Sequence, residues 1–133
     1  MKGRSGGGWT TPLLLLAVSG GLLLVCSGTS PLYRGHDWTD ANTYLTMGRG
    51  LLQGAVPYRD LFDHKGPLLY LLYALGAVLH PAGFYGVFVL QMLALAGTLY
   101  ALYRTARCLG AAPAAALVCA CALPVFLLSA GLY

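Results

Sequence analysis

The residues best suited to chemistry lie in one polar segment, residues 29–66, of an otherwise apolar chain. All four carboxylates are in this segment, at Asp37, Asp40, Asp60 and Asp63, and the sequence contains no glutamate. A carboxylate that faces water at a membrane surface is suited to act as a general base, which removes the proton of an attacking hydroxyl group. The gathering of every acid into one segment indicates that some of them serve a site.

The same segment carries cations, and Lys65 has the most telling position. It directly precedes Gly66-Pro67, a dipeptide that predicts the start of a helix. A lysine there is unfavourable for the helix dipole, but the ammonium and the helix N-terminus both attract an anion such as a lipid phosphate. A lysine that lies along the membrane and reaches water with its ammonium explains the residue equally well.

Metal-binding residue types are present but weakly grouped. His36, Asp37 and Asp40 could together hold a divalent cation. Short groupings of aspartate and histidine are common in loops, so neither a metal nor another cofactor is indicated. The cysteines stand in or beside apolar runs and are interpreted as small hydrophobic residues.

The composition sets the environment of these side chains. Hydrophobic residues make up 58% of the 133 residues and charged residues only 9%, with a mean hydropathy of +0.70. A soluble domain normally has about a quarter charged residues. The sequence therefore predicts an all-α membrane protein whose partners are lipids and not nucleic acids.

Three apolar stretches predict transmembrane helices, over residues 11–28, 84–103 and 113–133. The first stretch has a basic start and small residues after its apolar core, so a signal peptide is an alternative. The later spans favour a retained anchor. We expect a polytopic, multi-pass protein of the plasma membrane.

Charge bias orients these helices. Residues 1–10 and 104–112 contain cations and are predicted to be cytoplasmic. The first span then carries the chain outward, which makes residues 29–66 an outer loop. A single crossing by residues 84–103 returns the chain, so residues 67–80 are predicted to form a juxtamembrane helix that does not cross.

The outer loop is expected to contain an amphipathic helix over residues 40–53, which lies on the membrane surface. Thr39 or Asp40 is expected to cap its start and Gly54 to end it. In the juxtamembrane helix, the side chains expected in the acyl boundary are those of Leu68, Leu69, Tyr70, Leu71 and Leu72.

This order of features resembles the first outer loop of the GT-C integral membrane glycosyltransferases. The likeness is greatest to the family-39-like branch of protein mannosyltransferases and aminoarabinose transferases. It covers residues 30–107 and depends on an acidic motif after the first span (DWTDANTY), an amphipathic helix, a G-x-x-P-Y-x-D stretch (GAVPYRD) and a lysine before a proline (HKGP). The chain is then the N-terminal part of a larger GT-C fold.

The resemblance implies transfer of a hexosyl or pentosyl group from a polyprenyl-phosphate donor to an acceptor glycan, lipid or protein. It implies that a loop acid is the base, either Asp40 or Asp37, with Asp40 preferred. The expected substrate-binding residues are Lys65, Arg59, Tyr58 and His64. The isolated fragment is expected to be inactive.

Two alternatives remain. The loop charges suit a transporter or flippase component that binds a passing lipid headgroup. The chain would also suit a small non-catalytic membrane protein that packs through stretches such as AAPAAALVCA. Transporters place charges or broken helices at mid-membrane depth, and the predicted spans contain no charge, which favours the enzyme.

Overall fold

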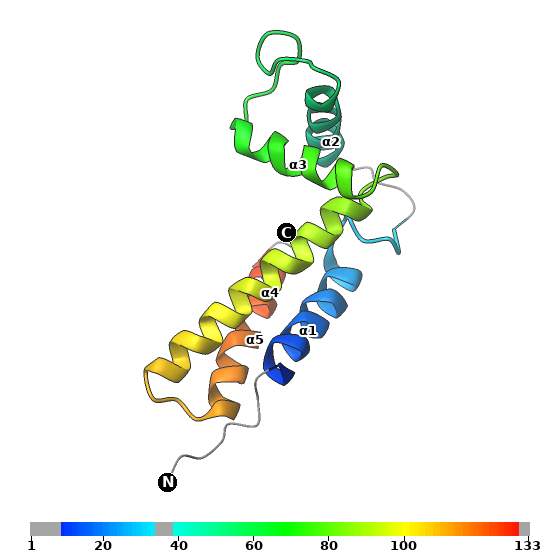
Figure 1. Ribbon diagram of the computed structural model, residues 1–133. Helices are drawn as coiled ribbons and strands as arrows, with labels where there is room; N and C mark the ends of the chain where they lie inside the picture. The colour runs from blue at the N-terminus through cyan, green and yellow to red at the C-terminus, as the bar shows by residue number, and fades with distance from the viewer. Residues whose placement is uncertain (1–8, 34–38, 131–133) are drawn as a thin grey trace. The chain divides into compact units, whose positions relative to one another are not determined.

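The computed structural model describes residues 9–33 and 39–130, which form five α-helices and no β-strand (Figure 1). The helices are α1 (Thr10–Cys26), α2 (Thr39–Leu52), α3 (Pro67–Leu79), α4 (Tyr85–Cys108) and α5 (Pro113–Ala130). The expected all-helical class is confirmed. The chain divides into two compact units, one of residues Leu23–Gln91 and one of Met1–Leu22 with Met92–Tyr133.

Of the helices in the described residues, α4 alone is long and apolar enough to cross a membrane, as judged by length and composition. It has 24 residues, whereas α1 has 17 and α5 has 18. The expected loop over 104–112 is partly wrong, because α4 continues to Cys108. Its end is set by Gly110 at φ 89°, where Ala111 N–H bonds the carbonyl of Ala106 at 3.0 Å.

Helix α2 ends as predicted and begins earlier than predicted. Gly54 has φ 87°, and Ala55 N–H bonds the carbonyl of Gly50 at 2.9 Å in a Schellman arrangement. The helix already includes Thr39, so the expected capping by Thr39 or Asp40 is wrong. Asp40 lies inside the first turn, where a carboxylate stabilises the positive end of the helix dipole.

The apolar face of α2 is buried against α3, not laid on the membrane surface as expected. Ala41 and Leu45 are each only 5% exposed, and they share the core cluster with Ala77 of α3. A Cβ atom added at Gly48 would lie 2.6 Å from the backbone nitrogen of Ala74. A glycine inside this helix, otherwise unfavourable, is thus required by the close approach of the two backbones.

Helix α3 has a buried face of one tyrosine and three small residues, and an exposed face of large apolar ones. Tyr70, Ala74, Gly76 and Ala77 are buried. The expected exposure of Tyr70 to lipid is wrong, since its side chain is fully buried. The exposed face, called the leucine row below, repeats at helical spacing and consists of Leu68, Leu71, Leu72, Leu75, Val78 and Leu79.

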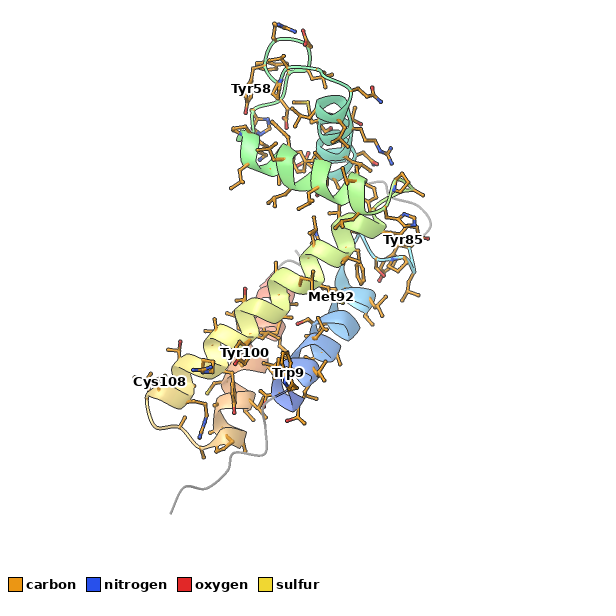
Figure 2. The ribbon with its side chains drawn as sticks, viewed as in Figure 1. Trp9, Tyr58, Tyr85, Met92, Tyr100 and Cys108 are labelled. Atoms are coloured by element: carbon orange, nitrogen blue, oxygen red, sulfur yellow. The ribbon has the colours of Figure 1, made fainter. Side chains whose placement is uncertain are left out.

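The first residues of α4 pack directly on α3 within the same unit. A Cβ atom at Gly76 would lie 2.7 Å from Cγ2 of Val87, and one at Gly86 would collide with the carbonyl of Gly76. Between the helices, Arg49 of α2 donates to the carbonyl of Pro81 at 2.9 Å. The ring of Tyr85 lies 5.1 Å from that of His80 (Figure 2).

The end of α1 is tied to the same part of α4 by side-chain hydrogen bonds. Thr29 Oγ1 donates to Oε1 of Gln91 at 2.6 Å, and Ser27 Oγ lies 3.2 Å from the same oxygen. Thr29 is only 3% exposed. This buried polar contact closes the unit that carries α2 and α3.

The second unit holds the remaining parts of α1 and α4 together with α5. Its buried positions are mostly small or aliphatic, at Leu15, Leu99, Ala116 and Ala120. A Cβ atom at Gly20 would lie 3.2 Å from Sδ of Met92. All four cysteines are free, and Cys26, Cys108 and Cys119 are exposed.

Candidate functional site

The loop between α2 and α3 begins with a turn over residues 55–61 that is closed by its own groups. Asp60 Oδ2 accepts a hydrogen bond from the backbone N–H of Val56 at 2.8 Å, and Tyr58 N–H donates to the carbonyl of Leu61 at 2.7 Å. Tyr58 has φ 66°, a left-handed conformation that is uncommon for a bulky residue. The turn holds Tyr58 there through these bonds.

Arg59 is engaged in this turn. It forms a two-pronged ion pair with Asp60, with Nε to Oδ1 and Nη2 to Oδ2 both at 2.8 Å. The hydrogen bond to Asp60 raises the pKa of Arg59, and the hydrogen bond from Arg59 is the main cause of the lowered pKa of Asp60. The guanidinium of Arg59 is thus already engaged by Asp60, and its expected role in substrate binding stays a prediction.

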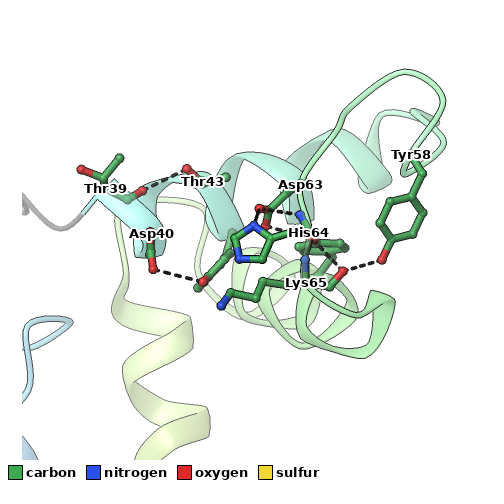
Figure 3. A network of polar contacts seen from close by, with 9 residues as sticks. Thr39, Asp40, Thr43, Tyr58, Asp63, His64 and Lys65 are labelled. Carbon is green, nitrogen blue, oxygen red and sulfur yellow. Dashed lines mark hydrogen bonds and ion pairs between the residues drawn. The ribbon is translucent and has the colours of Figure 1, made fainter.

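Asp63 anchors the second half of the loop to α3 (Figure 3). Its side chain is only 11% exposed. It accepts hydrogen bonds from the backbone N–H of His64 at 2.8 Å and from the hydroxyl of Tyr70 at 2.9 Å. The imidazole of His64 lies 3.0 Å away and remains 75% exposed. Asp63 thus has a structural role, and His64 extends outward from it.

Two tyrosine hydroxyls fix the backbone of Lys65. The Tyr70 hydroxyl accepts from Lys65 N–H at 3.1 Å and lies 2.9 Å from both Asp63 Oδ2 and the Lys65 carbonyl. It has one proton, and a carboxylate is the stronger acceptor, so we assign that proton to Asp63. The hydroxyl of Tyr58 donates to the Lys65 carbonyl instead, and each backbone group of Lys65 is satisfied.

The protonation states of Tyr70 and Asp63 follow from the same contacts. Burial and the hydrogen bond to Asp63 raise the pKa of Tyr70 to about 12. Partial burial alone would raise the pKa of Asp63, but the hydrogen bonds from Tyr70 and from His64 outweigh it and lower the pKa. At neutral pH the phenol is therefore a proton donor and the carboxylate an ionised acceptor.

Lys65 takes part in no ion pair among the described residues, and its charge and that of Asp40 both act on Tyr44. In the described residues the ion pairs of this loop join Arg59 to Asp60 and His64 to Asp63, and Lys65 takes part in neither. Tyr44 reports on what lies nearby: burial and then the charge of Asp40 raise its pKa, whereas the charge of Lys65 lowers it. Asp40, Tyr44 and Lys65 are called the acid–lysine site below, because the charges of Asp40 and Lys65 both act on the hydroxyl of Tyr44.

Tyr44 is positioned by both helices. Its ring packs edge-on against the ring of Tyr73 of α3, with centroids 5.6 Å apart. Its hydroxyl lies 3.4 Å from Oδ2 of Asp40, a long and weak hydrogen bond that leaves the carboxylate available. Figure 3 shows Asp40 on the first turn of α2 and Lys65 on the loop segment that leads into α3.

The sequence interpretation missed two residues of the site and named two that lie outside the described residues. Asp37 and His36 are not in the part that the structure describes. Tyr44 and Tyr70 were not selected as polar partners, although Tyr44 follows Asp40 by four residues, a spacing that brings side chains together on a helix. Tyr70 carried no comparable signal, because the turn that brings Asp63 to it is not a regular element.

Neither a metal centre nor a known relative defines this site. Within residues 9–33 and 39–130 no group of three or more histidine, cysteine or aspartate side chains is arranged to hold a metal ion. No family model, no curated protein and no solved structure matches the chain. The resemblance to GT-C glycosyltransferases therefore continues to depend on the sequence motifs.

Proposed function

We propose that this chain is the N-terminal part of an integral membrane glycosyltransferase that uses a polyprenyl-phosphate sugar donor at the outer face of the membrane. The observation that carries the proposal is the acid–lysine site. In the described residues Lys65 has no carboxylate partner, it directly precedes Gly66, the N-cap of the apolar helix α3, and its charge and that of the exposed Asp40 both act on Tyr44. A phosphate and a hydroxyl group are the substrates that such a pair of groups recognises.

The leucine row supports a lipid donor. It begins three residues after Lys65, at Leu68, which is 69% exposed, and continues along α3 to Leu79. The last turns of α3 are packed against the start of α4, the helix that is long and apolar enough to cross a membrane. A helix held there with an apolar outer face lies in the acyl boundary, and Lys65 then lies at the depth of lipid phosphates.

The proposed topology has the N-terminus in the cytoplasm and three crossings, by α1, α4 and α5. A span of 17 residues is at the lower limit for a helix that crosses about 30 Å of hydrocarbon, and α1 has 17 residues. The cations Arg104 and Arg107 at the far end of α4 support a cytoplasmic position for that end.

The reaction is a displacement at the anomeric carbon of the donor sugar. Asp40 accepts the proton of the acceptor hydroxyl, whose oxygen forms the new bond to the anomeric carbon. The bond between that carbon and the phosphate oxygen breaks, and its electron pair leaves on the phosphate. Because the leaving phosphate gains negative charge as the bond breaks, the ammonium of Lys65 stabilises the transition state more than the bound donor.

The decisive experiment compares Lys65→Ala with Arg59→Ala in the full-length protein in lipid nanodiscs. Donor binding and sugar transfer are both measured. We expect Lys65→Ala to weaken binding and to lower turnover, and Arg59→Ala to change neither strongly, because Asp60 already pairs Arg59. Lys65→Arg should restore only part of the activity, since a planar guanidinium replaces a compact charge. Unchanged binding and turnover in Lys65→Ala would reduce this residue to an interfacial anchor.

The base is tested by Asp40→Asn, with Asp37→Asn in parallel. Loss of a general base lowers the rate by about 10²–10⁴-fold, and we expect this loss for Asp40→Asn with donor binding retained. Full activity of Asp40→Asn together with an inactive Asp37→Asn would move the role to Asp37. Donor binding with no transfer to any acceptor in the wild type would favour a headgroup transporter.

Topology is tested with single cysteines in a cysteine-free background. An impermeant thiol reagent should label position 55, in the outer loop, and leave position 105 unlabelled in intact cells. The reverse pattern would overturn the proposed orientation.

A further inference from the structure

The hydroxyl of Tyr44 belongs to the acid–lysine site but takes no part in the proposed reaction. Among the described residues its hydrogen-bond acceptor is Oδ2 of Asp40, four residues earlier on α2, at 3.4 Å. A hydroxyl group that bonds a carboxylate well lies about 2.5–2.7 Å from it. Asp40 therefore holds the proton of Tyr44 only loosely, and a better placed acceptor can take the hydrogen bond.

The ring of Tyr44 is held by α3, so its hydroxyl oxygen has a fixed position. The ring packs edge-on against that of Tyr73, with centroids 5.6 Å apart. Tyr73 in turn packs against the core cluster that α2 and α3 share, and its Cβ atom would lie 3.0 Å from a Cβ atom added at Gly48. A change of acceptor therefore requires only a rotation of the O–H bond and no movement of the ring.

Contacts along α3 connect Tyr44 to the backbone of Lys65. Tyr70 and Tyr73 are three residues apart and lie on the same face of the helix. Tyr73 contacts the ring of Tyr44, and the hydroxyl of Tyr70 accepts from the backbone N–H of Lys65 at 3.1 Å. An anion bound by the Lys65 ammonium is thereby brought toward the side of α2 that carries Tyr44.

Tyr44 is a neutral hydrogen-bond donor in this site. Burial and then the charge of Asp40 raise the pKa of its phenol, and the charge of Lys65 opposes them without reversing the shift. Tyr44 thus keeps its proton at neutral pH. The other two hydroxyls around Lys65 are committed, since Tyr58 donates to the Lys65 carbonyl and Tyr70 bonds Asp63.

We propose that Tyr44 is a further substrate-contacting residue, whose hydroxyl donates a hydrogen bond to the phosphate that Lys65 binds. When the phosphate is bound, the O–H bond turns from Asp40 to a phosphate oxygen. The proton stays on the phenol, and both oxygens of Asp40 are then free to accept the proton of the acceptor. This inference rests on the proposed function, because it adds a contact to the same donor site.

The test measures binding of undecaprenyl phosphate to the full-length protein in nanodiscs, with undecaprenol as the probe that lacks the phosphate. Tyr44→Phe removes the hydroxyl and keeps the ring that packs on Tyr73. The matched control is Tyr100→Phe in α4. The hydroxyl of Tyr100 also bonds a charged side chain four residues away, that of Arg104, at 3.2 Å.

We expect Tyr44→Phe to bind undecaprenyl phosphate about tenfold more weakly than the wild type, because a hydrogen bond to a charged group is lost. Binding of undecaprenol should not change, and Tyr100→Phe should match the wild type with both probes. Equal phosphate affinity in the wild type and Tyr44→Phe would overturn the inference. An equal loss for both probes would overturn it as well, since the hydroxyl would then not act on the phosphate.

The Asp40→Asn background distinguishes a contact with the phosphate from an effect that passes through Asp40. If Tyr44 bonds the phosphate directly, Tyr44→Phe should weaken phosphate binding in this background too. A loss that disappears there would show that the hydroxyl acts only by shielding the phosphate from the Asp40 carboxylate, and the proposed contact would be wrong.

Lys65→Ala separates this inference from the proposed function. If Lys65→Ala abolishes phosphate binding while Tyr44→Phe binds the phosphate like the wild type, only the Tyr44 contact fails. If Lys65→Ala leaves phosphate binding unchanged while Tyr44→Phe weakens it, the donor site at Lys65 fails and the contact from Tyr44 stands.

Discussion

Two aspartates three residues apart in the same loop have opposite roles. Asp60 pairs with the adjacent Arg59 and with the N–H of Val56, and both partners belong to its own turn. Asp63 bonds the hydroxyl of Tyr70, seven residues away on α3. The side chain of Asp60 is 38% exposed and that of Asp63 is 11% exposed.

The difference between Asp60 and Asp63 shows which polar contacts determine the structure: those that join separate elements rather than those within one turn. An exposed pair within one turn is screened by water and adds little to stability. The largely buried contact between Asp63 and Tyr70 joins the loop to α3 and fixes the backbone at Lys65. The following changes are ordered from contacts that join elements to contacts that stay within one turn.

The largest effect is expected where the helices themselves meet. Gly48→Ala adds a Cβ atom 2.6 Å from the backbone nitrogen of Ala74, and overpacking of this kind typically destabilises a protein by about 1–3 kcal/mol. Gly97→Ala is the matched control, because its Cβ atom would meet nothing within 4 Å and alanine favours a helix. Denaturation in nanodiscs measures both variants, and equal stabilities would contradict the close approach of α2 and α3.

The next effect is expected for Asp63→Ala, which frees the loop from α3. The peptide bond after Lys65 should then become accessible to trypsin, since the Tyr70 anchor no longer holds the segment. Asp60→Ala should speed cleavage after Arg59 and leave cleavage after Lys65 slow. Mass spectrometry of timed digests distinguishes the two sites. Equal acceleration after Lys65 in both variants would show that the two aspartates act alike.

Alkaline pH should distinguish the two aspartates, because the Tyr70 hydroxyl bonds Asp63 and not Asp60. The pKa of Tyr70 is about 12 in the folded protein, against about 10 for an unperturbed tyrosine. The stabilisation is therefore fully present below about pH 10 and is lost as the pH rises through the folded value. Phenolate absorbance, compared between wild type and Tyr70→Phe, should show one tyrosine that ionises late. A difference spectrum whose ionisation midpoint is that of an ordinary tyrosine would contradict the hydrogen bond between Tyr70 and Asp63.

The smallest effect is expected for Asp60→Asn. It breaks an ion pair whose arginine side chain is 71% exposed, so the thermal midpoint should move little and the difference should vanish at high salt. The backbone bond to Val56 remains available to the amide oxygen. A loss of stability comparable to that of Asp63→Ala would contradict the claim that Asp60 and Asp63 contribute differently to stability.

The sequence predicts the helices because the spacing of apolar residues and the glycines and prolines at the helix ends determine them locally. The long span, the α3 start at Gly66-Pro67 and the α2 end at Gly54 were all readable in this way. The sequence did not predict which element covers the apolar face of α2. Amphipathicity indicates that a face is buried but not whether lipid or another helix covers it.

The sequence selects the charged residues of the candidate site but not their neutral neighbours Tyr44 and Tyr70. Lys65 and Asp40 stand out in a chain with few charges, so composition alone selects them. Tyr70 lies among leucines, and its role depends on a turn held by Tyr58 at φ 66°. Sequence patterns do not register such a turn, because its geometry arises from side-chain to backbone bonds between residues that share no period.

The span of chain enclosed by each contact sets an order of assembly. The Asp63–Tyr70 bond joins residues seven positions apart and the Arg49–Pro81 bond residues thirty-two positions apart, whereas the Thr29–Gln91 bond joins residues sixty-two positions apart. Short loops close at lower entropic cost, so the α2–α3 hairpin with its Lys65 turn is expected to form before the bond from Thr29 to Gln91. That bond also needs α4 as far as Gln91, whereas the hairpin contacts need the chain only as far as Pro81. Force measurements on nascent chains stalled where the residues up to Phe84 have just emerged should therefore detect the earlier event alone.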